Sequence, residues 1–136
     1  LEEALRNVNQ RRMYWVTYKT KHTKMVMESK GRRHYFIIDP VTKKYLFIIN
    51  ALQSLWHLTI ERPDVIISTG AGMAYPTLYF AKKIFKAKII FIESAAAVVD
   101  ATNTAKKVYP ISDLFLIQWE ELKSIFPKAV YTGGVL

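Results

Sequence analysis

Segments rich in β-branched and aromatic residues alternate along this chain with segments whose apolar residues recur at helical spacing. The first kind predicts short strands, at residues 13–18, 33–39, 64–69, 88–94, 113–118 and 129–134. The second kind predicts helices, at residues 1–8, 21–29, 45–60, 76–85 and 119–126, while residues 95–110 are mixed. Nearly continuous apolar strands that alternate with helices are typical of parallel sheets. The pattern therefore predicts an α/β, Rossmann-like fold whose parallel sheet carries helices on both faces.

The predicted helix at residues 45–60 contains no charged side chain. One face of it is apolar, and the other carries Asn50, Gln53, Ser54 and His57. A membrane span needs about 20 predominantly apolar residues, so this helix is too short and too polar to be one. We expect the polar face, including His57, to be solvated. The apolar face either packs against the sheet, which we favour, or inserts into a membrane surface.

Length and composition predict a single domain. The 136 residues are 51% hydrophobic, and no linker, repeat or low-complexity tract divides them. The chain has no cysteine, which excludes disulfides and thiolate metal sites, and its three histidines lack metal-ligand spacing. We expect neither a metal site nor a cofactor.

Positive charge is concentrated in one quarter of the chain. The net charge is +9, and residues 11–44 contain ten Lys or Arg against Glu28 and Asp39. Such a block attracts the phosphates of nucleic acid, anionic lipid or a phosphorylated substrate. A solvated basic face with no dedicated partner is the simpler alternative.

The segment DVIISTGAGMAYP, residues 64–76, joins a buried strand to a helix through two glycines. Gly70 and Gly72 can take positive φ and let backbone N–H groups approach a ligand, and Pro76 is suited to the first turn of the helix that follows. A glycine loop that leads into a helix N-terminus is a ready anion site. The segment is neither G-x-G-x-x-G nor a Walker loop, so a tight turn without a ligand is an equal alternative.

Residues 62–136 resemble a known family through the motifs STGAG, FIES, VYPISDLF and QWEEL, which occur in order. They are similar to the PssD family of bacterial polysaccharide-biosynthesis proteins and to its eukaryotic relative, the membrane-recruiting subunit of the two-part dolichyl-diphosphate GlcNAc transferase. The resemblance implies the acceptor-side, N-terminal half domain of a GT-B glycosyltransferase of the MurG kind. A separate small subunit would then bind the UDP-sugar.

The resemblance also implies roles for individual residues. Glu93 would lie at the acceptor cleft as a candidate base, although it could equally cap a helix or pair with a lysine. Tyr109, Pro110 and Asp113 would serve the fold or the subunit interface. The acceptor-binding positions would be Ser68, Thr69, Gly70, Gly72, Pro76 and Ser94. The positions that serve the fold or the partner interface would be Gln118, Trp119 and Glu120.

The chain departs from the family pattern at two places. Family members open with a strand and a G-G-H loop, whereas residues 1–3 resemble the positions just after that histidine. We therefore expect the first strand, normally in the middle of the sheet, to be missing through N-terminal truncation, and an upstream anchor stays open. Ala95, Ala96 and Ala97 replace bulkier or basic residues, which weakens the expected grip of this loop on a phosphate.

Together these observations predict a membrane-docking, acceptor-binding subunit that is inactive without its partner. It would help transfer sugar from a UDP-sugar to a polyprenyl-diphosphate-linked saccharide in capsule or exopolysaccharide synthesis. It would lie peripherally on the cytoplasmic face of the plasma membrane, as part of a heterodimer, with docking through Arg32, Arg33, Lys43 and Lys44.

Two other functional classes are compatible with the composition. A non-catalytic α/β domain that binds nucleic acid would explain the charge, although no RRM, KH or helix-turn-helix pattern is present. A self-sufficient sugar-nucleotide enzyme is the other, although no recognisable pair of base and nucleophile is present. We expect no nucleic-acid partner.

Overall fold

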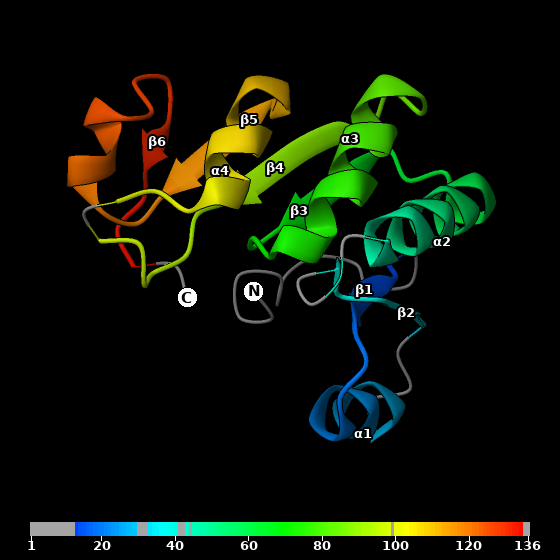
Figure 1. Ribbon diagram of the computed structural model, residues 1–136. Helices are drawn as coiled ribbons and strands as arrows, with labels where there is room; N and C mark the ends of the chain where they lie inside the picture. Colours follow the sequence, from blue (N-terminus) through cyan, green and yellow to red (C-terminus); the bar gives the residue numbers. More distant parts are fainter. Residues whose placement is uncertain (1–12, 30–32, 41–42, 44, 99, 135–136) are drawn as a thin grey trace.

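The computed structural model describes residues 13–29, 33–40, 43, 45–98 and 100–134 (Figure 1). Its strands are β1 (Trp15–Tyr18), β2 (His34–Ile37), β3 (Val65–Ser68), β4 (Lys88–Ile92), β5 (Leu114–Ile117) and β6 (Val130–Tyr131). Its α-helices are α1 (Lys21–Ser29), α2 (Leu46–Glu61), α3 (Tyr75–Lys83) and α4 (Asn103–Val108). Short 3₁₀ helices lie at Gly72–Ala74, Tyr109–Ile111 and Glu120–Ser124.

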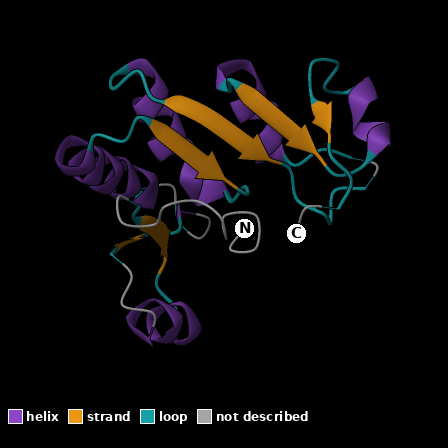
Figure 2. Cartoon of the chain, turned by 180° about the vertical axis from the view of Figure 1, so that it is seen from behind, coloured by secondary structure: helices purple, strands orange, loops and turns teal. Residues whose placement is uncertain are grey.

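The strands form two parallel sheets. β1 pairs with β2, and the second sheet has the order β3-β4-β5-β6. Every pair is parallel, which confirms the predicted α/β, Rossmann-like class. Helices α3 and α4 lie on one face of the four-stranded sheet, and in Figure 2 the strands of that sheet lie in front of them. In the part of the chain that the structure describes, the helices that cover this sheet lie on the face occupied by α3 and α4.

Aromatic side chains fill the core between β4, β5 and the C-terminal segment. The ring of Phe91 stacks on Phe115 with 5.1 Å between centroids, and Phe115 lies 4.7 Å from Phe126. All three are at most 4% exposed. Burial of a phenylalanine stabilises the fold by roughly 1.5–3 kcal/mol, so this cluster anchors both central strands.

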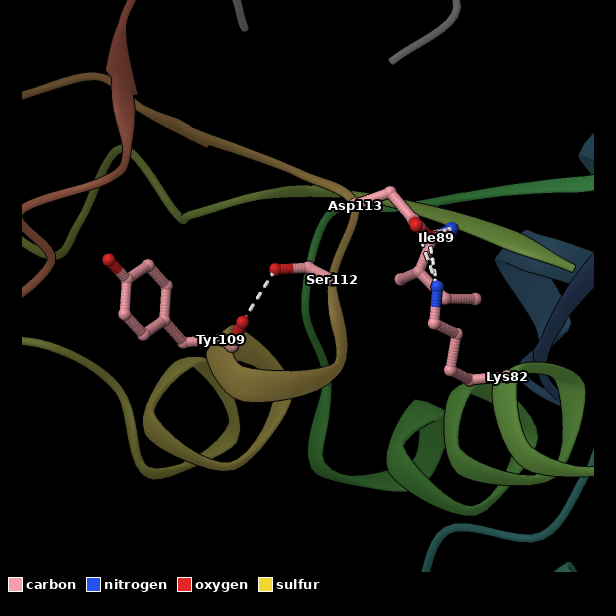
Figure 3. A network of polar contacts seen from close by, with 5 residues as sticks. All are labelled: Lys82, Ile89, Tyr109, Ser112 and Asp113. Atoms are coloured by element: carbon pink, nitrogen blue, oxygen red, sulfur yellow. Dashed lines mark hydrogen bonds and ion pairs between the residues drawn. The ribbon is translucent and has the colours of Figure 1, made fainter. Parts of the chain in front are cut away.

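Asp113 fastens the amino ends of β4 and β5 to α3 (Figure 3). Lys82 Nζ donates to both carboxylate oxygens at 2.6 and 2.7 Å, and the Ile89 N–H donates to Oδ2 at 2.8 Å. The hydrogen bonds from Lys82 and Ile89 lower the pKa of Asp113. Ser112 Oγ donates to the Tyr109 carbonyl at 2.8 Å beside it. These contacts agree with the fold role expected of Tyr109 and Asp113.

A cavity separates the two sheets. Residues 13–18 line one side of it, residues 61–71 line the other, and its volume is about 1030 Å³. These two segments contain β1 and β3. Each is the edge strand of its own sheet that borders the cavity. Among the described strands, β1 pairs only with β2 and β3 only with β4, so each has one edge without a neighbouring strand. The cavity has room for a strand between them.

Two predicted segments differ from the structure in their local geometry. Residues 119–126 were expected to be helical, and they form a short 3₁₀ helix, Glu120–Ser124. Trp119 precedes it in an extended conformation without a side-chain cap, and Pro127 comes after it. The mixed segment contains α4, which Thr102 caps at its N-terminus. No helix in the described residues is long and apolar enough to span a bilayer.

Candidate functional site

Because the strands run parallel, the loops that come after β3, β4 and β5 meet at one edge of the sheet. An added Cβ at Gly72, in the first loop, would lie 3.9 Å from Thr104 in α4. The second loop is joined to the end of β5 through Gln118 Nε2, which donates to the Glu93 carbonyl at 2.9 Å. The predicted acceptor and catalytic positions are thereby gathered at the carboxyl edge.

The two glycines of the first loop differ. Gly70 has a φ of +78°, and a Cβ there would lie 3.0 Å from Cζ of Phe91. Ser68 Oγ accepts a hydrogen bond from the Gly70 N–H at 3.3 Å and closes the turn. Of the two glycines that could take positive φ, Gly70 does and Gly72 does not. A Cβ at Gly72 would make only an ordinary van der Waals contact, with Thr104. Gly70 serves the turn, whereas Gly72 leaves backbone accessible beside α4.

The first turn of α3 contains Pro76, as predicted. Pro76 and Thr77 are buried, so Pro76 acts through the shape of the turn. Thr69 and Ser68 line the cavity between the sheets. Ser94 Oγ accepts from the Ala96 N–H at 3.2 Å, so its hydroxyl stabilises the second loop.

Glu93 is 1% exposed and holds the second loop together. Its Oε1 accepts from the Ser94 N–H at 2.8 Å, and Thr102 Oγ1 donates to the carboxylate at 3.1 and 3.2 Å. The same Thr102 oxygen accepts from the Ala105 N–H and caps α4. Of the roles expected for Glu93, its contacts favour helix capping. Glu93 does not cap α4 itself but binds Thr102, the residue that does. Its role as a base stays a prediction.

The three predicted interface residues occupy different environments. Gln118 is 4% exposed and serves the fold. Trp119 is 39% exposed and donates its Nε1–H to the Ala95 carbonyl at 2.7 Å, which fixes the indole across the second loop. Glu120 is exposed. Trp119 and Glu120 are therefore accessible to a partner.

Helix α2 is turned in the opposite sense to the one expected. Asn50 and Ser54 are 0% exposed and His57 is 1% exposed, so the prediction of a solvated polar face is wrong. Asn50 Nδ2 donates to the carbonyls of Ile38 at 2.7 Å and Met73 at 3.1 Å. The hydroxyls of Ser54 and Thr77 lie 2.7 Å apart. These hydrogen bonds offset the cost of burying the polar face.

The outward face of α2 is an apolar stripe. Ile48, Leu52, Trp56 and Ile60, each four residues from the last, are 65%, 62%, 54% and 56% exposed. Tyr45, just before the helix, is 59% exposed. We call Tyr45, Ile48, Leu52, Trp56 and Ile60 the α2 stripe. A contiguous exposed apolar surface of this kind marks a site of contact with a membrane or another protein.

His57 lies between aromatic rings. It stacks on Tyr35 at 5.6 Å between centroids and meets Tyr14 edge-on at 5.9 Å. Burial lowers its pKa from 6.5 to about 4 and outweighs the opposing effect of Glu61. Neither ring nitrogen has a hydrogen-bond partner in the described structure. His57 is therefore a neutral packing residue at neutral pH.

Of the predicted docking cations, Arg33 and Lys43 lie in the described residues, and their surroundings differ. Arg33 Nη2 lies 2.8 Å from Oε2 of Glu61, whose other oxygen accepts from the Tyr35 hydroxyl at 2.7 Å. The charge of Arg33 therefore compensates a carboxylate whose side chain is 8% exposed. Lys43 is exposed, with its Nζ 5.8 Å from the centroid of the Tyr45 ring. Arg32 and Lys44 lie outside the described residues.

No cluster of three or more His, Cys, Asp or Glu that could hold a metal occurs within residues 13–134 as far as they are described. The candidate site thus consists of backbone, hydroxyl groups and the Glu93 carboxylate at the sheet edge, with an apolar helix face on the neighbouring surface.

Comparison with known proteins identifies the family. A family model described as "Oligosaccharide biosynthesis protein Alg14 like" matches residues 11–135. The chain belongs to the Alg14-like family. This is the eukaryotic side of the expected resemblance, and the match carries no specific assignment to the PssD type.

Individual relatives agree with this family. The UDP-N-acetylglucosamine transferase subunit ALG14 of Candida albicans is 36% identical over 103 residues, which are 72% of this chain and 45% of that protein. The human subunit of the same name is 29% identical over 98 residues, 65% of this chain and 45% of that protein. The chain thus spans about half the length of the curated relatives it matches.

A solved structure supports the fold. The crystal structure of Acinetobacter baumannii MurG superposes with a TM-score of 0.64 over 79% of this chain and 33% of the MurG chain. At 11% sequence identity, the likeness concerns the fold alone.

Proposed function

We propose that this chain is the acceptor-binding, membrane-docking subunit of a bipartite glycosyltransferase. It presents a polyprenyl-diphosphate-linked saccharide to a separate subunit, which binds the UDP-sugar. The chain docks peripherally on the cytoplasmic face of the membrane and is inactive without that partner.

The single observation that carries docking is the inverted helix α2. A buried polar face with hydrogen-bonded Asn50 and Ser54 fixes the orientation of the helix, and this orientation leaves Ile48, Leu52 and Trp56 outward. Apolar side chains on an interfacial helix insert into the boundary of headgroups and acyl chains, and nearby cations draw the protein to anionic lipid. The net charge of +9 supports an anionic membrane as the occupant of this face.

In this proposal the chain is one acceptor-side half domain. Its two parallel sheets flank a cavity lined by β1 and β3, and one more parallel strand there would join them into a single sheet. The first strand expected from the family resemblance would occupy this place. A second Rossmann unit, which would hold the UDP-sugar, would come from the partner.

The donor and the pathway are suggested by different relatives. Two relatives named as UDP-N-acetylglucosamine transferase subunits favour UDP-N-acetylglucosamine as the donor. The PssD likeness would instead place the reaction in capsule or exopolysaccharide synthesis. An assay with UDP-N-acetylglucosamine and UDP-galactose, each with the partner present, distinguishes these two versions of the proposal.

Within the site, the loop with Gly70 and Gly72 would contact the acceptor, and Trp119 and Glu120 would meet the partner. Gly72 supports this assignment because it is exposed and an added Cβ would meet nothing closer than Thr104 Oγ1 at 3.9 Å. Glu93 would hold the second loop in place, and its action as a base would require that loop to open.

Vesicle flotation tests the docking role. Leu52→Glu places a charge on the α2 stripe, and Thr59→Glu places the same charge on the same helix at another exposed position. We expect Leu52→Glu to reduce flotation with anionic vesicles by about tenfold, because a charge resists insertion, and Thr59→Glu to retain most of it.

Equal flotation of both variants would contradict the docking role. Salt-sensitive binding to single-stranded RNA without affinity for vesicles would support the nucleic-acid alternative instead.

A further inference from the structure

A small groove lies between α2 and α3, beside the α2 stripe. Its lining residues, Phe47, Ala51, Tyr75, Pro76, Tyr79 and Phe80, enclose about 230 Å³. The polar contact between these two helices, through Ser54 and Thr77, is made by other side chains. We call this feature the α2–α3 groove.

The walls of the groove are suited to hydrocarbon. All six lining side chains are aliphatic or aromatic, and Phe47 and Tyr79 remain 44% and 40% exposed. The rings of Tyr75 and Tyr79 lie 6.1 Å apart, and those of Tyr79 and Phe80 lie 5.9 Å apart. An apolar cavity of about 150 Å³ holds a benzene molecule. The groove is larger than that, and on the order of two five-carbon units would fit.

The groove begins where the glycine loop ends. Gly72 and Ala74 belong to the short turn after β3, and Tyr75 and Pro76 come directly after it as the start of α3. Lys107 of α4 lies with its Nζ 5.8 Å from the centroid of the Tyr75 ring. One end of the groove therefore adjoins a loop with accessible backbone and a cation, while the lining itself is apolar. Such an arrangement matches a ligand with an anionic head and a hydrocarbon tail.

We propose that the α2–α3 groove binds the first isoprenoid units of the acceptor lipid. This inference rests on the proposed function, because the acceptor diphosphate would lie at the loop around Gly72. From that position, the chain would pass Tyr75 and Pro76, enter the groove between Phe47 and Tyr79, and leave along the α2 stripe toward the bilayer. The tyrosines suit this path, since their rings offer apolar surface and their hydroxyls can remain in water.

The same apolar chemistry could be satisfied by a membrane acyl chain, and the choice of probe separates the two sources. Farnesyl monophosphate has a branched isoprenoid chain and an anionic head, whereas dodecyl phosphate has a straight chain. Both are used below their aggregation concentrations, without vesicles, and binding is measured by calorimetry. We expect farnesyl monophosphate to bind at least about tenfold more tightly, as a shape-matched groove requires.

A substitution that fills the groove tests its position. Ala51→Phe adds a ring inside the groove, and Thr59→Phe adds one on the same helix at an exposed position outside both the groove and the α2 stripe. We expect Ala51→Phe to weaken farnesyl monophosphate binding by about tenfold or more and Thr59→Phe to leave it within about twofold. Tyr79→Ser, at an exposed wall position, is the second variant if Ala51→Phe does not fold, and it should weaken binding in the same direction.

The outcomes separate this inference from the proposed function. Vesicle flotation should be unchanged in Ala51→Phe, because the α2 stripe is intact. Wild-type protein that floats with vesicles but does not bind farnesyl monophosphate would overturn the groove assignment and leave docking standing. Equal binding of the straight and branched chains, or equal loss in Ala51→Phe and Thr59→Phe, would also overturn it. Binding of farnesyl monophosphate without flotation would support the groove and contradict docking.

Discussion

Gly70 and Gly72 stand two positions apart in one loop, yet only Gly70 needs to be a glycine for the fold. Its positive φ and its approach to Phe91 both exclude a side chain, whereas a Cβ at Gly72 meets nothing closer than 3.9 Å. Sequence reasoning located the loop correctly but could not tell which glycine carries the turn, because that depends on Phe91 from the neighbouring strand.

The difference between these glycines gives the first prediction. Gly70→Ala should lower the free energy of unfolding by about 1–2 kcal/mol, because it forces an L-residue into left-handed backbone beside the Phe91 ring. Gly72→Ala should change it by less than about 0.5 kcal/mol. Urea unfolding measures both. Equal destabilisation by the two changes would contradict the assignment.

In the reconstituted pair, Gly72→Val should reduce transfer per folded molecule by about tenfold or more, because its side chain fills the approach to the loop. A melting curve for the same sample shows whether the variant is folded. Full activity of a folded Gly72→Val protein would show that the glycine does not serve the acceptor.

His57 gives a pH-dependent prediction. Its pKa is about 4 in the folded protein and near 6.5 in the unfolded chain, so the unfolded chain binds more protons between these values. The contribution of His57 to stability is therefore fully present above pH 6.5 and is lost as the pH falls toward 4. On linkage grounds, the loss should be on the order of 2–3 kcal/mol.

His57→Phe provides the control for this titration. It keeps a ring against Tyr35 and removes the proton, so stability at pH 7 should be unchanged or slightly higher. The decline in stability between pH 6.5 and 4 should be correspondingly shallower in the variant. If the stability of the two proteins fell equally between pH 6.5 and 4, the pKa of His57 would not be lowered in the folded protein.

At the scale of elements, the sequence predicted most helices and strands but not how α2 is turned. The helix expected at residues 21–29 is α1 with the same bounds, and the expected strands contain β1 to β6. The helical period identified the two faces of α2. It could not determine which face is inside, because the partners of Asn50 are the carbonyls of Ile38 and Met73, 12 and 23 residues away.

The inverted orientation of α2 makes its own prediction. Asn50→Ala should cost about 1–3 kcal/mol of stability, because it leaves the carbonyls of Ile38, partly buried, and Met73, buried, without that donor. Leu52→Ala, on the exposed face, should cost less than about 0.5 kcal/mol. Chemical denaturation of both variants is the measurement. A larger loss from Leu52→Ala than from Asn50→Ala would show that the apolar face is the buried one.

At the scale of the whole molecule, the sequence reports how many charges there are but not what each one does. The basic block predicts a docking patch, and this stays a prediction. One of its members, Arg33, also pairs with Glu61, 28 positions later at the C-terminal end of α2. Composition reports the number of charges, whereas their use depends on long-range pairing. The strand pattern and the family resemblance both predicted the fold class, which the parallel pairing confirms. The carboxyl-edge site and a further strand between β1 and β3 stay predictions.

This cavity can be tested by adding a strand. A second copy of residues 64–70 placed ahead of residue 1 supplies an apolar strand, and residues 1–13 are long enough for a crossover of about a dozen residues. We expect hydrogen exchange in both β1 and β3 to slow by about tenfold or more. The control is the same extension with prolines in place of the copies of Ile66 and Ile67. Proline has no N–H to donate, so this extension cannot pair as a strand between two others. Protection of only one strand, or of neither, would contradict a strand site shared by both sheets.

In the proposed function, this chain supplies the acceptor side of a reaction whose donor side belongs to another subunit. Sugar transfer from radiolabelled UDP-N-acetylglucosamine to a polyprenyl-diphosphate-linked saccharide tests this division, with this protein alone, the UDP-binding subunit alone, and the two mixed. We expect product only in the mixture, together with no calorimetric binding of UDP-N-acetylglucosamine by the isolated chain. Turnover by this chain alone, or its binding of the nucleotide sugar at micromolar concentrations, would contradict the division between the two subunits.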